Sequence, residues 1–179
     1  MIKYTKIDVG ENYTTPCETA EALSGKLNCI LKEKRLTISV CESFTAGRIS
    51  AQIIRVPGAS AIFHEGIVSY SNLSKTERLS VKKKTLENFG AVSAECCAEM
   101  VGGLIATGEC DVAISSTGIA GPNSDGTDKP VGLCYIGIAT ERETLVYKYN
   151  ISGTREEITE TAVKLALSSA IAETEKYKK

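Results

Sequence analysis

The chain has 179 residues, 42% of them hydrophobic, and its 21 basic and 22 acidic side chains nearly cancel. A chain of this length can fill one core and bury roughly 70% of its unfolded surface, so we expect a single domain. The balanced charge excludes the basic surface that wraps nucleic acid or lies on an anionic membrane, and the expected partner is a small molecule.

The first residues of the chain predict a strand or an ordered arm. Residues 2–9 are rich in β-branched side chains, and we assign residues 1–14 to this amino-terminal arm and residues 15–179 to the domain that follows. A helix is predicted next, because Thr15 offers an N-cap, a proline occupies the first helical position and a glutamate lies three residues after the cap. Its apolar stripe extends to about Lys34.

A buried strand is predicted at residues 37–41, a short β-branched run that leads directly into Ser43. The helix that follows ends at the Pro-Gly pair of residues 57–58. Ser43 is therefore expected at a strand-to-helix turn, where unpaired amides and the positive end of the helix dipole could stabilise an oxyanion. The alternative is that Ser43 only caps this helix.

A second strand is predicted at residues 67–70, followed by a short helix that begins at Lys75 and has Ser74 as its N-cap. A further helix has Ser93 as its N-cap and ends near Gly108. The remaining elements are a buried strand at residues 111–117, a glycine-containing turn at 117–122, a polar loop at 123–129, the two strands of a hairpin at 131–140 and 144–151, and a last helix that begins with the capping box at Thr154. Strands that alternate with helices and then form a hairpin predict an α/β fold: a three-layer α/β/α sandwich with a mixed sheet, in a single domain.

The seven cysteines are predicted to be buried free thiols, because they fall within apolar helix and strand patterns and include no Cys-x-x-Cys pair. They are Cys17, Cys29, Cys41, Cys96, Cys97, Cys110 and Cys134. The sequence contains no signal peptide and no apolar run long enough for a membrane span, so the expected location is a reducing cytoplasm.

A serine nucleophile activated by a lysine is the chemistry that the sequence favours. A Ser-His-Asp hydrolase would have to use His64, the one histidine of the chain, which we expect to be a polar surface or turn residue. Ser43, Tyr70 and Lys75 instead lie in two short segments. In this arrangement Lys75 is the base, and Tyr70 relays a proton or holds the serine hydroxyl.

Lys75 can act as a base only with a lowered pKa. That pKa must fall from ~10.4 to about 7–8, a change of ~4 kcal/mol, whereas a helix dipole supplies about 0.3–1 kcal/mol, so burial must provide the remainder. The alternatives are a solvated surface lysine and, for Tyr70, an amphipathic side chain at a strand edge. The turn of residues 117–121 could approach a ligand closely, and the alternative is a turn without a ligand. Arg155 could reach a phosphate, and the alternative is a solvated arginine.

Together these segments resemble the carboxy-terminal domain of the competence/damage-inducible CinA proteins, the family of nicotinamide mononucleotide amidohydrolases (deamidases). The resemblance covers Thr37 to about Arg155 in one colinear order. The matching segments are residues 42–47, 56–60, 70–72 with Lys75, 90–93, 117–122 and 129–132. Several motifs in one order are more specific than any one of them.

Carried over position by position, the resemblance implies that Ser43 is the nucleophile, Lys75 the base and Tyr70 the assisting tyrosine. It matches Thr117 to an active-site threonine of the family and Arg155 to a family arginine. We expect the substrate-binding residues to be Thr45, Thr117, Gly118, Gly121 and Arg155. The resemblance also implies an α/β/α fold, catalysis without a metal or another cofactor, and a homo-oligomer that is dimeric or higher. Many members of the family carry an additional amino-terminal pyrophosphatase-like domain.

The sequence departs from the family pattern next to the nucleophile. Phe44 replaces the usual cysteine, Ala46 replaces the first of two glycines, and the loop of residues 122–129 keeps the family length without its glycine run. The resemblance implies hydrolysis of the carboxamide of nicotinamide mononucleotide to nicotinate mononucleotide and ammonia. Two alternatives stay open: a non-catalytic nucleotide-binding or assembly module whose pocket Phe44 and Ala46 have closed, and a Ser-Lys amidase that acts on another amide.

Overall fold

Strands and helices follow one another largely as the sequence predicts. The computed structural model describes residues 2–124 and 126–177. The strands are β1 (Thr5–Gly10), β2 (Ile38–Glu42), β3 (Phe63–Val68), β4 (Val112–Gly118), β5 (Leu133–Thr140) and β6 (Thr144–Asn150). The helices are α1 (Ala20–Lys34), α2 (Arg48–Ile54), the short 3-10 turn η1 (Ala59–Ala61), α3 (Asn72–Leu79), α4 (Lys83–Phe89), α5 (Ala94–Ile105) and α6 (Arg155–Lys176).

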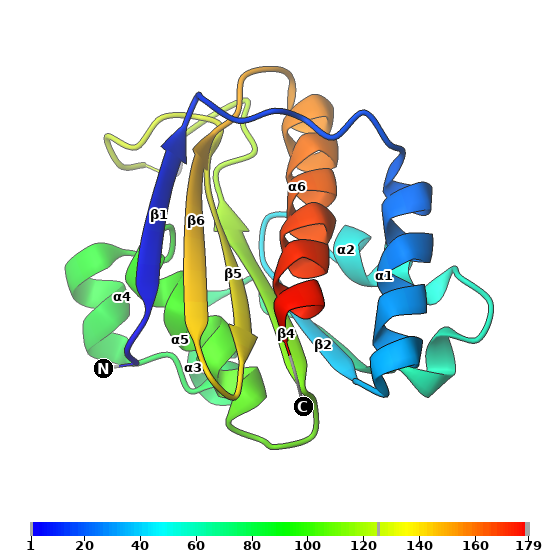
Figure 1. The fold of residues 1–179 in the computed structure, drawn as a ribbon. Helices are drawn as coiled ribbons and strands as arrows, with labels where there is room; N and C mark the ends of the chain where they lie inside the picture. Colours follow the sequence, from blue (N-terminus) through cyan, green and yellow to red (C-terminus); the bar gives the residue numbers. More distant parts are fainter. Residues whose placement is uncertain (1, 125, 178–179) are drawn as a thin grey trace.

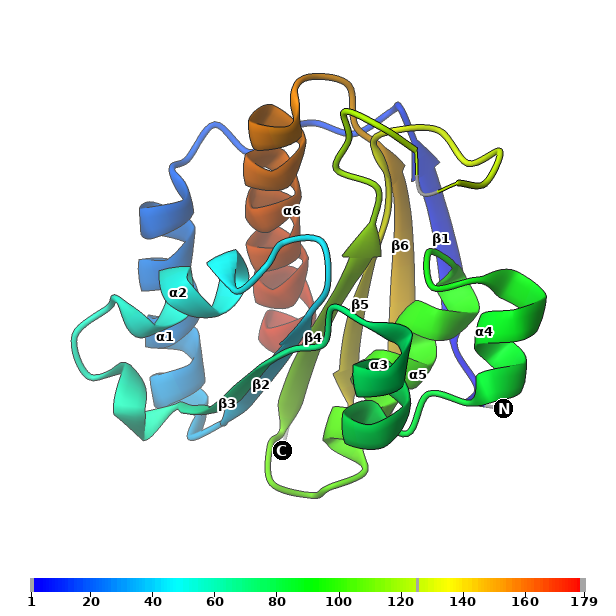
Figure 2. The same cartoon turned by 180° about the vertical axis from the view of Figure 1, so that it is seen from behind.

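One mixed sheet lies between two layers of helices (Figure 1, Figure 2). Within the described residues its strand order is β1-β6-β5-β4-β2-β3. β2 pairs in parallel with both β3 and β4, β1 pairs in parallel with β6, and antiparallel pairs join β4 to β5 and β5 to β6. Helices α1, α2 and α6 cover one face, and α3, α4 and α5 cover the other. The predicted three-layer α/β/α sandwich with a mixed sheet is thereby confirmed.

Alternate residues of the central strands supply two separate cores, since successive side chains of a strand point to opposite faces. In β2, Val40 packs into the cluster shared with α1, α2 and α6, whereas Cys41 packs with α5 on the other face. β4 repeats the pattern with Ile114 in the first cluster and Ala113 in the second. Because both faces are covered, these strands appear in the sequence as nearly continuous apolar runs.

Two predicted helix caps and the predicted hairpin are confirmed. Ser93 Oγ accepts a hydrogen bond from the Cys96 amide at the start of α5, and Thr154 and Glu157 form a complete capping box at the start of α6. β5 and β6 are the antiparallel strands of the hairpin. Residues Thr5–Gly10, within the predicted arm, form the edge strand β1.

The predicted start of the first helix is wrong. α1 begins at Ala20, and its N-cap is Thr19, whose Oγ1 accepts a hydrogen bond from the Ala22 amide at 3.1 Å. Thr15 fits the same local pattern, but the helix packs against the core from Ala20 and its buried residues begin at Leu23. Packing of the helix on the core, more than local propensity, decides where the helix begins.

The segment before Lys75 also differs from the prediction. β3 ends at Val68, so only the first two residues of the strand predicted at residues 67–70 belong to it. Ser71, not Ser74, is the N-cap of α3, because its Oγ accepts a hydrogen bond from the Ser74 amide at 3.1 Å. Lys75 therefore lies in the second turn of this helix. Helix α4, only seven residues long, was not predicted.

Candidate active site

The predicted nucleophile lies where three parallel strands end together. Ser43 follows β2, the segment Ser69–Tyr70 follows β3, and the turn at residues 118–121 closes β4. Carboxyl ends of parallel strands meet at one edge of a sheet, which is where open α/β sheets bind ligands. The parallel pairing thus brings together three segments that are distant in the sequence.

Ser43 lies at the strand-to-helix turn as predicted, but it precedes the first turn of the helix. α2 begins only at Arg48. Two tight turns fill the gap: the Ala46 amide donates to the Ser43 carbonyl at 3.2 Å, and the Arg48 amide donates to the Thr45 carbonyl at 3.1 Å. The second turn needs positive φ values at Ala46 (53°) and at the residue that follows it, Gly47 (90°).

Lys75 reaches Ser43 from α3. Its Nζ donates to Ser43 Oγ at 2.9 Å, to the Ser69 carbonyl at 2.7 Å and to the Tyr70 carbonyl at 3.2 Å. The side chain is 1% exposed, the largest of the fully buried side chains in the described chain. The predicted dyad is therefore in hydrogen-bond contact, with the amine shielded from bulk water and the serine at the pocket.

The surroundings of Lys75 favour the neutral amine. Burial lowers the pKa of Lys75, although the nearby Cys96 and Cys41 oppose this in part. Among the described residues, Lys75 makes no ion pair with a carboxylate. A neutral amine has two N–H groups and one lone pair, which match two backbone carbonyls and one hydroxyl. The same three oxygen atoms can also accept all three N–H groups of the ammonium that forms when the amine takes a proton.

A pocket of about 200 Å³ opens in front of the serine. Its lining consists of Ser43, Phe44, Tyr70, Gly118, Ile119, Ala120, Gly121, Asn123, Ser124 and Arg155. Phe44 is only 5% exposed and also belongs to the core, yet the pocket stays open. Tyr70, in contrast, is 66% exposed, and its hydroxyl makes no hydrogen bond with a described residue. The contact of Tyr70 with the dyad is made by its backbone carbonyl.

Arg155 and Gly121 form one wall of this pocket. Arg155 is the first residue of α6, and its Nη1 donates to the Gly121 carbonyl at 2.7 Å. The other guanidinium nitrogens bond to no residue of the described ranges, so they are available to a ligand. Gly121 has a φ of 80°, which a residue with a side chain rarely adopts.

Two of the predicted substrate-binding residues do not line the pocket. Thr45 Oγ1 and Ser116 Oγ share a hydrogen bond of 2.6 Å, and Thr117 Oγ1 donates to the Ala91 carbonyl at 2.8 Å. Both threonines are at most 1% exposed. Their hydroxyls hold the turn after β2 and the end of β4 in place.

A buried carboxylate beside the nucleophile was missed as a functional candidate. Glu42 is 0% exposed, and its two oxygen atoms accept hydrogen bonds from Gly47, Ile49 and Ser50. The available signal was a glutamate at the end of an otherwise apolar, buried run.

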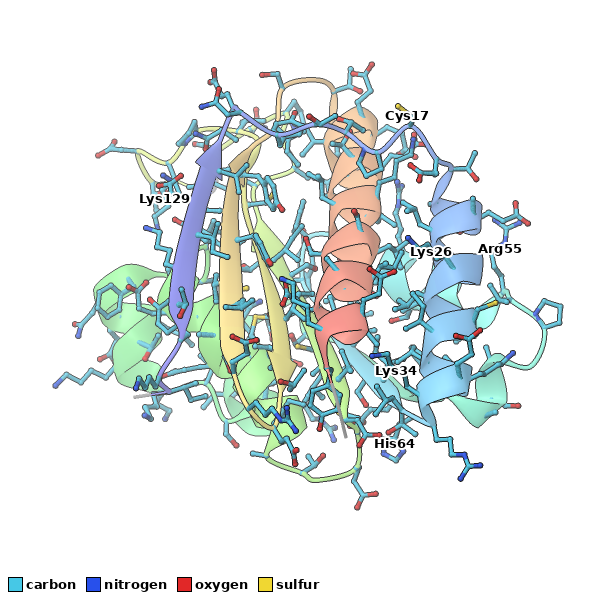
Figure 3. The ribbon with its side chains drawn as sticks, in the orientation of Figure 1. Cys17, Lys26, Lys34, Arg55, His64 and Lys129 are labelled. Atoms are coloured by element: carbon cyan, nitrogen blue, oxygen red, sulfur yellow. The ribbon has the colours of Figure 1, made fainter. Side chains whose placement is uncertain are left out.

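His64 is excluded as a partner of the serine. It is the second residue of β3, so it lies at the amino end of the parallel strands, opposite the end that carries Ser43, and its side chain is exposed (Figure 3). All seven cysteines are free thiols as predicted. The prediction that all are buried is wrong for Cys17 and Cys29, which are exposed.

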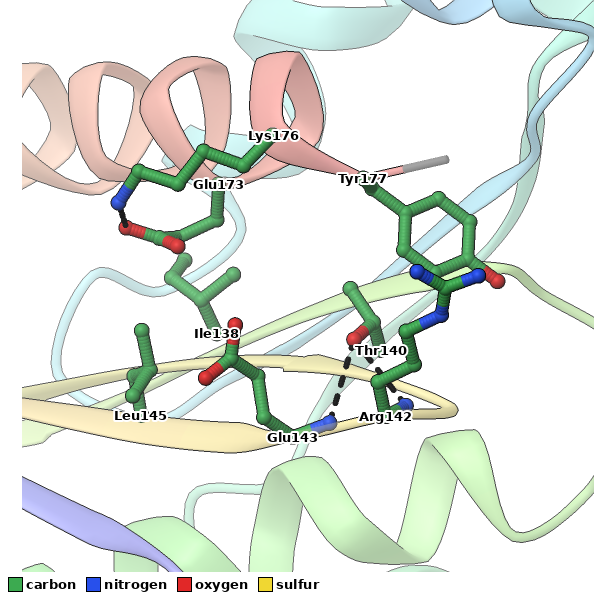
Figure 4. A pocket seen from close by; sticks show the side chains of 8 residues that line it. All are labelled: Ile138, Thr140, Arg142, Glu143, Leu145, Glu173, Lys176 and Tyr177. Atoms are coloured by element: carbon green, nitrogen blue, oxygen red, sulfur yellow. Dashed lines mark hydrogen bonds and ion pairs between the residues drawn. The ribbon is translucent and has the colours of Figure 1, made fainter. Parts of the chain in front are cut away.

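A smaller hollow lies at the opposite end of β5 and β6 (Figure 4). Its volume is about 110 Å³, and it lies between the hairpin and the end of α6. Glu173, which lines it, accepts hydrogen bonds from the Tyr147 hydroxyl and from Lys176 Nζ, both at 2.8–2.9 Å. Glu173 and Lys176 are thus paired with each other, and no hydrogen bond between the residues that line the hollow is a counterpart of the Ser43–Lys75 contact.

Two properties of the described residues concern metals and membranes. No group of three or more His, Cys, Asp or Glu side chains in residues 2–124 and 126–177 could hold a metal ion. No helix among them is both long enough and apolar enough to cross a bilayer.

Comparison with known proteins gives a consistent family. Residues 20–173 match the family model described as the CinA C-terminal domain. A CinA-like protein of Fusobacterium nucleatum is 51% identical over 137 residues, which cover 76% of this chain and 33% of that protein. The crystal structure of the competence/damage inducible protein CihA from Agrobacterium tumefaciens superposes with a TM-score of 0.83 at 31% identity, covering 89% of this chain and 98% of that one.

A second crystal structure, of the competence damage-inducible protein A (ComA) from Klebsiella pneumoniae, has a TM-score of 0.87 at 25% identity and covers 90% of this chain and all of that one. The chain spans about a third of the length of the curated relatives that it matches. The solved structures, in contrast, match it over nearly their whole length.

Proposed function

We propose, since the chain belongs to the CinA C-terminal domain family, that it hydrolyses the carboxamide of nicotinamide mononucleotide to nicotinate mononucleotide and ammonia. The observation that carries this proposal is the hydrogen bond of 2.9 Å between buried Lys75 Nζ and Ser43 Oγ. A buried amine without a carboxylate partner is a suitable base for a serine hydroxyl at the mouth of a pocket.

The first step forms an acyl-enzyme. Neutral Lys75 takes the proton of Ser43 while the serine oxygen forms a bond to the amide carbon, and the carbonyl electron pair moves onto the oxygen. When this oxyanion collapses, the carbon–nitrogen bond breaks and the Lys75 ammonium returns its proton to the leaving nitrogen, which departs as ammonia. Tyr70, at the pocket wall, would assist this proton transfer with its hydroxyl.

The second step consumes one water molecule. Lys75 takes a proton from the water as its oxygen attacks the acyl carbon, and the bond to Ser43 breaks with return of that proton to the serine. The sum is one amide and one water converted to one carboxylic acid and one ammonia. Lys75 thus exchanges protons with the serine oxygen, the leaving nitrogen and the attacking water in turn.

The substrate would lie between the two walls of the pocket. Arg155 has free guanidinium nitrogens for the phosphate, and the backbone at Gly118 and Gly121 lies open to the ligand. Thr45 and Thr117 would contribute indirectly, through their buried hydrogen bonds to Ser116 and Ala91.

The test is release of ammonia from nicotinamide mononucleotide. Ser43→Ala should abolish it, whereas Ser24→Ala, a control at a fully buried serine whose Oγ has no partner in the described chain, should retain it. No release by the wild-type protein would reject this substrate. Equal release by wild type and Ser43→Ala would reject the nucleophile.

The proposal extends to assembly, compartment and domain limits. The chain would form a homo-oligomer, supported by the outer position of β3 in the sheet and by the exposed side chains of Val68 (51%) and Leu73 (64%) near its end. Light scattering should give at least twice 19.1 kDa, and Leu73→Lys should reduce that mass.

The seven free thiols support a reducing cytoplasm. Residues 15–179 would form the amidohydrolase domain that follows the amino-terminal strand.

A further inference from the structure

We propose that Glu42 is a positioning residue, which fixes the turn after β2 so that the backbone amide of Phe44 binds the oxyanion. The inference rests on the proposed function for the identity of the reaction. It concerns a different part of the site, because neither Ser43 nor Lys75 supplies a donor for the developing negative charge.

Glu42 gathers four hydrogen bonds in a fully buried position. One carboxylate oxygen accepts from the amides of Gly47 at 3.1 Å and Ile49 at 3.0 Å. The other accepts from the Ser50 amide at 2.9 Å and from Ser50 Oγ at 2.7 Å. A carboxylate is thus bonded to the amino-terminal amides of α2, where the helix dipole favours negative charge.

These contacts remove α2 as an oxyanion site. The Ile49 and Ser50 amides at the helix start already donate to Glu42, and the Arg48 amide donates to the Thr45 carbonyl. The charge of the Glu42 carboxylate would also repel a second anion there. The helix start predicted from the sequence therefore cannot stabilise the tetrahedral intermediate. The donors must come from elsewhere in the pocket.

The turn between Ser43 and Ala46 offers such a donor. Phe44 lines the pocket, and no residue of the described chain accepts a hydrogen bond from its amide. The turn is closed by the bond from the Ala46 amide to the Ser43 carbonyl, and neither central residue has a positive φ, as in a type I turn. The amide directly after a serine nucleophile is well situated for an oxygen on the carbon that this serine attacks.

The turn is held on both sides. The Ser43 amide donates to the Ser116 carbonyl at 3.0 Å, and Thr45 shares its hydroxyl bond with the Ser116 side chain, so one side is tied to β4. The other side is tied by Glu42, which binds the chain again where it enters α2. A donor that is fixed before the reaction needs no reorganisation as the charge develops.

The first experiment compares two buried glutamates. In Glu42→Gln, the new side-chain N–H group points at backbone amides that are themselves donors, so hydrogen bonds are lost. Glu99→Gln makes the same change at a glutamate that is 4% exposed and accepts hydrogen bonds from the Lys82 amide and from Thr85 Oγ1. We expect kcat for ammonia release to fall about 10- to 100-fold in the first variant with KM little changed, and the second variant to match wild type. Equal kcat in the two folded variants would overturn the proposal.

Labelling of Ser43 by a fluorophosphonate separates this inference from the choice of substrate. Serine oxygen forms the bond to phosphorus, fluoride leaves, and Lys75 takes the proton, so the probe needs the dyad and the oxyanion donors but no nucleotide. Intact mass should show slower labelling of Glu42→Gln than of Glu99→Gln. If the wild-type protein is labelled but releases no ammonia, the substrate is wrong and the labelling rates still decide the role of Glu42.

A second pair of variants tests the amide itself, and it applies even where Glu42→Gln fails to fold. Phe44→Pro and Phe44→Ala both lose the ring, but only the proline variant loses the N–H group, and proline suits this position of the turn. Loss of one oxyanion donor lowers kcat by roughly 10²–10³-fold. We expect that difference between Phe44→Pro and Phe44→Ala, in kcat and in labelling rate, and equal rates would refute the donor role.

Discussion

Lys75 Nζ donates a hydrogen bond of 2.9 Å to Ser43 Oγ although the two residues are 32 positions apart in the sequence. The contact exists because β2 and β3 are parallel neighbours, so that the segments after both strands leave the sheet at the same edge. Two carbonyls after β3 hold the amine on its other side. The geometry of the dyad is therefore a property of the sheet.

The pH dependence of catalysis should report the amine. Burial lowers the pKa of Lys75 below its ordinary value of 10.5, and only the neutral form can take the serine proton. We expect log kcat/KM to rise with a slope of one as pH increases and to reach its plateau below pH 10.5. A rise whose midpoint lies at 10.5 would mean that the base is an exposed lysine.

Replacement of this lysine by arginine removes the base and keeps a positive charge. Arginine stays protonated in proteins, so Lys75→Arg should lower kcat by about 10²–10⁴-fold, the usual contribution of general-base catalysis. Lys83→Arg, at an exposed position of helix α4, is the matched control and should behave as wild type. Both variants are to be compared in ammonia release after circular dichroism has shown that they are folded. A Lys75→Arg protein with wild-type kcat would exclude Lys75 as the base.

The hydroxyl of Tyr70 can be separated from its backbone carbonyl. Tyr70→Phe keeps the carbonyl that binds Lys75 and the ring in the pocket wall, but it removes the hydroxyl. We expect kcat to fall about tenfold, at the lower end of what a proton relay contributes. Unchanged kcat would restrict the role of Tyr70 to its carbonyl and its ring.

Arg155 should be specific for a charged group of the substrate. Loss of a hydrogen bond to a charged group costs about 1.5–3 kcal/mol, so Arg155→Met should raise KM for nicotinamide mononucleotide roughly 10- to 100-fold. In this variant KM for the dephosphorylated riboside should change little, because the contact that is removed is one to phosphate. Arg48→Met, which removes an exposed pair with Glu156 outside the pocket, is the control. An equal increase in KM for both substrates would show that the arginine acts only through its hydrogen bond to Gly121.

Ala46 stores backbone strain that a glycine would relieve. Its φ of 53° costs an alanine about 1–2 kcal/mol, and the greater freedom of glycine in the unfolded chain offsets roughly 0.5–1 kcal/mol of the gain. We expect Ala46→Gly to raise the free energy of unfolding by ~0.5–1 kcal/mol in urea titrations. Ala51→Gly, within α2, should lower it by about 1 kcal/mol. If both changes destabilise equally, the turn holds no strain at Ala46.

Prediction from the sequence succeeded where a feature depends on near neighbours. The caps at Ser93 and Thr154 and the β5–β6 hairpin follow from residues that lie within a few positions of one another. It failed where two nearby residues could each cap the same helix. Thr19 rather than Thr15 caps α1, and Ser71 rather than Ser74 caps α3. Each threonine or serine could cap a helix, and the choice was made by which apolar face packs on the sheet.

The sequence by itself determined the alternation of strands and helices, and it identified a serine and a lysine as the candidate pair in a chain with one histidine. Only the tertiary structure decided that Lys75 is buried against Ser43, that Thr45 and Thr117 turn away from the pocket, and that Glu42 occupies the start of α2. The physical reason is that burial and distance depend on which strands pair and which faces pack. Spacing along the chain determines which residues meet within one turn or strand, whereas contacts across the sheet arise from the fold as a whole.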